Sequence, residues 1–93
     1  MSVERRNILF SGHVQGVGFR MTTVHLSHDL PLAGTVRNMD DGRVELIVEG
    51  EMQDIDELIR RLREQFGSLL RTVQQNSVPA SGAPLAGGIR IVH

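Results

Sequence analysis

One stretch of this sequence joins a strand, a turn and a helix start: Asn7-Ile8-Leu9-Phe10-Ser11-Gly12-His13-Val14-Gln15-Gly16-Val17-Gly18-Phe19-Arg20. Its first five residues form an apolar stretch that predicts a strand. The segment from Met21 to about Leu30 is compatible with a helix. A glycine-rich turn between a strand and a helix start lets successive backbone N–H groups converge on an anion. The stretch therefore predicts an anion-binding loop where the strand meets the helix.

The residue types in this loop suit a phosphate. Gly16 and Gly18 let the chain turn tightly and allow a ligand to approach the backbone. Arg20 presents a planar cationic fork that matches phosphate oxygens. The alternative is an ordinary tight turn whose arginine pairs with a carboxylate.

The composition excludes several other chemistries. The sequence has no cysteine, which rules out disulfides, thiolate metal sites and cysteine-nucleophile phosphatases. It also has no lysine, so the glycine loop is not a Walker-type P-loop and Schiff-base chemistry is excluded. Any phosphate site must therefore use arginine and backbone amides.

The composition also argues against nucleic-acid and membrane partners. The net charge of −1 gives no field that would steer such partners. The three phenylalanines are the only aromatic residues, too few for a platform that stacks bases. Because no stretch resembles a signal peptide or a membrane span, we expect a cytoplasmic protein. With 93 residues, 40% of them hydrophobic, we expect one domain over residues 1–93, and a monomer.

Local patterns place the other elements. Strands are expected at about 5–13, 33–38 and 43–49, within 69–78, and at 89–92, with a loop at 79–84. The Asp41-Gly42 pair predicts a hairpin between the second and third strands. The first helix is expected at about 22–30, with Met21, Val24 and Leu30 among the candidates for its buried side.

The second helix has the clearest pattern. One apolar face is formed by Ile55, Leu58, Ile59, Leu62 and Phe66. Asp54 with Glu57 resembles a capping box, Gly67 is a natural stop, and Glu57 with Arg61 forms a favourable pair one turn apart.

The order βαββαβ predicts an α+β fold, a ferredoxin-like sandwich. We expect an antiparallel sheet with two helices on one face and a short extra C-terminal strand. If the first two strands are parallel, a right-handed crossover brings their C-terminal ends to the same edge of the sheet. The glycine loop with Arg20 leaves the first strand there, and Asn38 ends the second, so both would face one pocket.

Two motifs resemble those of the acylphosphatase family. They are Gly12-His13-Val14-Gln15-Gly16-Val17-Gly18-Phe19-Arg20 and Gly34-Thr35-Val36-Arg37-Asn38-Met39-Asp40-Asp41-Gly42-Arg43-Val44. The resemblance runs from the first strand through the second helix. It implies hydrolysis of the carboxyl–phosphate bond of acyl phosphates to a carboxylate and inorganic phosphate, without a metal or other cofactor. It also implies that Arg20 and Asn38 are the catalytic residues, with Asn38 holding the water.

The chemistry agrees with that implication. Phosphoryl transfer needs charge stabilisation on the phosphoryl oxygens and a positioned water. The expected phosphate-binding residues are Gln15, Gly16, Val17, Gly18, Phe19 and Arg20. One alternative is a non-catalytic phosphate-metabolite-binding module of the same fold. Asn38 favours the enzyme, because binding alone needs no water-orienting amide; its own alternative is a turn residue before the hairpin.

Four further features bear on the site and the core. His25 and His28 have a spacing that can chelate a metal, but without a third ligand a polar helix face is preferred. His13, at the loop entrance, could touch a bound anion. Pro31 stands where the family usually has Gly, so the first helix must end without a left-handed residue. Thr35 replaces a usual aromatic residue, which we expect to weaken core packing.

Overall fold

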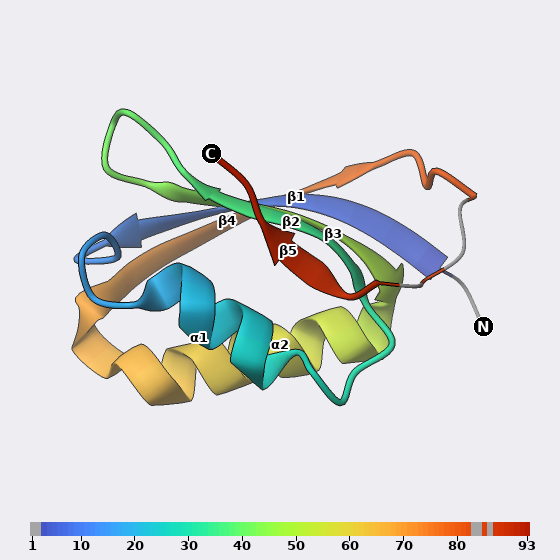
Figure 1. Cartoon of the computed structure of the whole chain (residues 1–93), viewed down its shortest axis with the longest axis horizontal. Coiled ribbons are helices and arrows are strands. Elements are labelled where there is room, and N and C mark those ends of the chain that lie inside the picture. The colour runs from blue at the N-terminus through green and yellow to red at the C-terminus, as the bar shows by residue number, and fades with distance from the viewer. Residues whose placement is uncertain (1–2, 83–84, 86) are drawn as a thin grey trace.

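A five-stranded sheet carries both helices on one face (Figure 1). The computed structural model describes residues 3–82, 85 and 87–93. The elements in chain order are β1 (Val3–Gly12), α1 (Phe19–Leu26), β2 (Ala33–Asn38), β3 (Val44–Glu51), α2 (Met52–Phe66), a 3₁₀ turn η1 (Gly67–Leu69), β4 (Leu70–Val78) and β5 (Ile89–Ile91). The ferredoxin-like arrangement expected from the sequence is confirmed. No helix in the described part of the chain is long and apolar enough to cross a membrane.

The strand order is β4-β1-β3-β2-β5. The four longer strands pair antiparallel, as expected, whereas the short β5 adds parallel to β2, so the complete sheet is mixed. Since β1 and β2 both run antiparallel to β3, they are parallel to each other. Their C-terminal ends therefore lie at the same edge. Of the loop expected at 79–84, residues 83 and 84 lie outside the described residues.

Three phenylalanines hold the start of α1 in the core. The ring of Phe19 lies 4.9 Å from that of Phe10 on β1 and 4.7 Å from that of Phe66 on α2. Phe19 is only 2% exposed. Such aromatic pairs add about 0.5–1.5 kcal/mol beyond the area they bury. The first residue of α1 is thus anchored between the sheet and the second helix.

Helix α1 is shifted from its expected position. It begins at Phe19 instead of Thr22 and ends at Leu26 instead of Leu30. Phe19 and Thr23, one turn apart, form its buried side, and Met21 is 65% exposed, so the expectation that Met21 is buried was wrong. The cause is tertiary, because the position of Phe19 in the core decides which face of the helix turns inward.

Helix α2 buries the five apolar residues that its pattern predicted. Its start differs from expectation. The N-cap is Glu51, which makes no side-chain cap bond, because α2 follows β3 directly and Asp54 already lies inside the first turn. The predicted capping box was therefore wrong. Gly67 ends the helix with a φ of +52°, as predicted.

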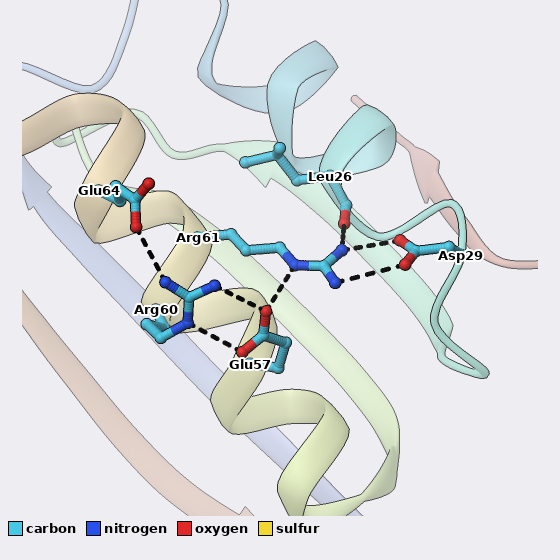
Figure 2. A network of polar contacts seen from close by, with 6 residues as sticks. All are labelled: Leu26, Asp29, Glu57, Arg60, Arg61 and Glu64. Carbon is cyan, nitrogen blue, oxygen red and sulfur yellow. Dashed lines mark hydrogen bonds and ion pairs between the residues drawn. The ribbon is translucent and has the colours of Figure 1, made fainter.

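Arg61 of α2 stabilises the end of α1 (Figure 2). Its Nη1 donates to the carbonyl oxygen of Leu26 and to Asp29 Oδ1, both at 2.7 Å, and its Nε donates to Glu57 Oε2 at 2.8 Å. The C-cap Ser27 has a φ of −93°, so α1 ends without a left-handed residue, as Pro31 led us to expect. A guanidinium from the neighbouring helix thus binds one of the last carbonyls of α1, which no N–H within the helix can satisfy.

The expectation that Thr35 weakens core packing was wrong. Thr35 lies opposite Ile47 on β3 and beside Arg90 on β5, whereas its neighbour Val36 is fully buried in the core. Side chains alternate along a strand, so Thr35 is on the face of the sheet away from the helices. It replaces no core residue.

Candidate active site

The glycine loop, residues 13–18, leaves β1 and enters α1 at one end of the sheet. Its first residue is fixed by a hydrogen bond of 2.8 Å from the His13 N–H to the carbonyl oxygen of Leu69. Gly16 and Gly18 have φ values of +76° and +77°, which side-chain-bearing residues rarely adopt. Figure 1 shows this loop in blue at the same end as the green hairpin between β2 and β3.

The backbone N–H groups of the loop are available to a ligand. Within the described part of the chain, none of the N–H groups of residues 14–18 donates to a backbone or side-chain acceptor. The first turn of α1 follows at once, and a helix start leaves further N–H groups without intrahelical partners. Unpaired N–H groups at a helix N-terminus attract anions.

Arg20 is half-buried and makes no ion pair with any residue that the structure describes. By contrast, Arg37 pairs with Glu45 at 2.7 Å and Arg43 with Asp41 at 2.8 Å. The alternative for Arg20 was a tight turn whose arginine pairs with a carboxylate. The described residues offer it no such carboxylate.

Asn38 ends β2 on the same face as the buried Val36. Its side chain is half-buried and forms no hydrogen bond to the described residues. The hairpin is closed by other groups, since the Met39 N–H donates to the Arg43 carbonyl at 2.8 Å and the Arg43 N–H to Asp41 Oδ1 at 3.1 Å. The Asn38 side chain is therefore not one of the groups that close the hairpin.

These groups line one small pocket of about 120 Å³. It is lined by Val14, Gly16, Gly18, Phe19, Arg20, Met21, Asn38 and Ile91. The structure thus brings Arg20 and Asn38 together with Gly16, Gly18 and Phe19, as the topology predicted. Gln15 and Val17 are not among the lining residues. Val17 packs against the core, and the Gln15 side chain points to the hairpin.

Sequence reasoning missed two apolar walls of this pocket. Met21 was expected in the core, and Ile91 entered no prediction about the site. Ile91 reaches the pocket because β5 pairs in parallel with β2, placing Ile91 beside Val36. A three-residue strand carries no signal of which neighbour it will pair with, so the sequence could not have indicated this.

The histidines lie outside the pocket. His13 is exposed at the loop entrance and is not a lining residue. His28 lies beyond the end of α1, so it does not share a helix face with His25. Among the described residues there is no cluster of three or more histidine or acidic side chains that could hold a metal ion.

A larger pocket, of about 210 Å³, lies elsewhere on the sheet. Its lining includes Arg5, Thr35 and Glu49 but none of the predicted site residues. Size does not decide between the two, since pockets of about 300 and 330 Å³ also occur on this surface. The chemistry favours the smaller pocket, because loop N–H groups, a guanidinium and a side-chain amide that have no partner among the described residues meet there.

Comparisons with known proteins agree with the motifs. A family model described as acylphosphatase matches residues 6–82. An acylphosphatase of Corynebacterium glutamicum (strain R) is 44% identical over 71 residues, which cover 76% of each chain. One of Synechococcus sp. (strain JA-2-3B'a(2-13)) is 36% identical over 81 residues, 86% of each chain. A crystal structure of an acylphosphatase from Bacillus subtilis, 27% identical, is similar with a TM-score of 0.84 over 99% of this chain and 100% of that one.

Proposed function

The chain belongs to the acylphosphatase family and hydrolyses acyl phosphates to a carboxylate and inorganic phosphate, and we propose that it does so without a metal, using Arg20 and Asn38. The observation that carries this proposal is the meeting of Arg20, Asn38 and the glycine loop around one pocket.

Arg20 and the loop would hold the phosphoryl group. Donors fixed in place before the reaction stabilise the charge that develops on the phosphoryl oxygens. The proposed donors are the backbone N–H groups from Gln15 to Phe19, with the Arg20 fork adding a full positive charge. Support comes from the absence of competing acceptors for the N–H groups of residues 14–18, and of a carboxylate partner for Arg20, among the described residues.

Asn38 would hold the attacking water. A side-chain amide can accept from water through its oxygen and donate through its nitrogen, while carrying no charge of its own. The leaving group is a carboxylate, a weak base, so no strong general acid is needed. Orientation of the water is then the main contribution left for a side chain to make.

We propose that the chain acts as a monomer in the cytoplasm, as one domain over residues 1–93, and that its partners are an acyl phosphate and inorganic phosphate. The charge balance and the scarcity of aromatic residues speak against a nucleic-acid partner.

Hydrolysis of benzoyl phosphate by purified protein in excess chelator tests the reaction and its independence of metal together. We expect full activity and competitive inhibition by inorganic phosphate. Arg20→Lys should lose most of the activity and most of the inhibition by phosphate, because a point charge cannot reproduce a bidentate fork. The matched control is Arg71→Lys on exposed β4, which should change neither. Activity abolished by chelator and restored by a divalent ion would overturn the metal-free mechanism.

A further inference from the structure

The side chain of Gln15 joins the two halves of the site. Its Nε2 donates to the carbonyl oxygen of Met39 at 2.8 Å and to that of Arg43 at 3.0 Å. Gln15 directly precedes Gly16 in the loop, and Met39 directly follows Asn38 in the hairpin. One amide group therefore ties the loop to the segment that carries Asn38.

The hairpin end of this tie is itself well held. The Arg43 carbonyl also accepts the Met39 N–H at 2.8 Å, and the Met39 carbonyl accepts the Gly42 N–H at 3.2 Å. Both acceptors of Gln15 thus belong to the turn that follows Asn38. A shift of the loop relative to the turn would have to break both bonds.

We propose that Gln15 is a positioning residue, whose side chain sets where the Asn38 amide lies relative to the phosphate held by the loop. The inference rests on the proposed roles of Arg20 and Asn38. It gives Gln15 a task that its backbone N–H does not perform, since the side chain points to the hairpin. Gln15 does not touch the substrate through this amide; it acts through Asn38.

The chemistry of the contact restricts what can replace it. Two carbonyl oxygens need two protons from one nitrogen, which the glutamine amide supplies. Methionine keeps a similar length and flexibility but donates nothing. An ionised glutamate accepts only, so it would face two carbonyl oxygens with a negative charge.

Kinetics of Gln15→Met test the proposal. We expect kcat for benzoyl phosphate to fall about 10- to 100-fold, since a displacement of about 1 Å can cost that much. The inhibition constant of inorganic phosphate should change by less than about threefold, because the loop and Arg20 remain. The matched control is Gln74→Met on exposed β4, which should leave both values unchanged.

A double-variant cycle separates positioning from a general loss of structure. If Gln15 acts through Asn38, Gln15→Met should change kcat by less than about twofold when Asn38 is already Ala. A structural defect would instead multiply the two losses. Urea unfolding of each variant identifies any protein that fails to fold.

The Gln15→Glu variant supplies a second readout that does not depend on Met. Its kcat relative to wild type at the same pH should rise as the pH falls toward about 4.3, the ordinary glutamate pKa. A protonated carboxyl has one O–H donor and can restore one of the two bonds. If the side chain of Gln15 contributed nothing to turnover, kcat would show no such recovery.

The outcomes separate this inference from the function it rests on. If Asn38→Ala itself keeps normal kcat, the proposed water-holding role fails. If Asn38→Ala collapses kcat while Gln15→Met leaves it unchanged, or if the two losses multiply, the positioning role is wrong and the proposed function stands.

Discussion

Replacing Gly16 with alanine separates the strain of the loop from its function. Gly16 has a φ of +76°, and a Cβ at this position would meet no heavy atom of the described residues within 4 Å. The cost to folding is therefore conformational alone, roughly 1–2 kcal/mol for a side chain held at positive φ. Against an ordinary stability of about 5–15 kcal/mol the variant stays folded. Its melting temperature should fall by roughly 4–8 °C for each kcal/mol.

The effect on phosphate should be larger than the strain implies. An alanine relieves its strain by rotating the adjoining peptide groups, which turns at least one N–H away from the pocket. A hydrogen bond to a charged group is worth about 1.5–3 kcal/mol, so the inhibition constant of phosphate should rise roughly 10- to 100-fold. Competitive inhibition of benzoyl phosphate hydrolysis measures that constant.

Gly82→Ala is the matched control. Gly82 also has a φ of +76°, no atom of the described residues lies within 4 Å of its Cβ position, and it does not line the pocket. We expect a similar drop in melting temperature with unchanged phosphate inhibition. Equal phosphate inhibition constants in the two alanine variants would refute the idea that the loop amides bind phosphate.

Three further predictions use other parts of the structure. Asn38→Ala should lower kcat by roughly 10²–10³-fold. The melting temperature of this variant should stay near that of wild type, because the Asn38 side chain bonds to no described residue. A normal kcat would make Asn38 a mere turn residue. Phe19→Ala should cost about 3–5 kcal/mol in urea unfolding, since its buried ring contacts those of two other phenylalanines; a change under about 1 kcal/mol would contradict that packing. Hydrogen bonds from Arg60 and Arg61 lower the pKa of Glu57 from 4.5 to about 2, so its contribution to stability is present above pH 4.5 and is lost as the pH falls toward 2. Glu57→Gln should therefore flatten the acid limb of melting temperature against pH, and an unchanged slope would mean that the pair adds nothing.

Much of the site could be predicted because its signals are local. Gly16 and Gly18 are required by a turn whose φ values are positive, and Arg20 follows within the same stretch. The meeting of Arg20 with Asn38 needed one more step, the rule that parallel strands end at the same edge. That step is topological, and it follows from the order of the elements.

The errors have a different origin. The α1 boundaries and the exposure of Met21 depend on Phe19 packing between Phe10 and Phe66, which are distant in sequence. The predicted capping box assumed a gap between β3 and α2, but the two elements are continuous. In each case the packing of the whole molecule overrode a preference that a short stretch of sequence shows.

By itself the sequence determined the order of the elements, the apolar face of α2, and a glycine loop that requires arginine and backbone amides for any anion. These depend on local periodicity and on what glycine and arginine can do chemically. Only the tertiary structure decided that β5 pairs with β2, that Arg61 binds the end of α1, and that Gln15 ties the loop to the hairpin. The physical reason is that each of these contacts joins partners far apart in the chain. A long side chain or a short strand can reach many acceptors, and packing of the whole molecule selects one.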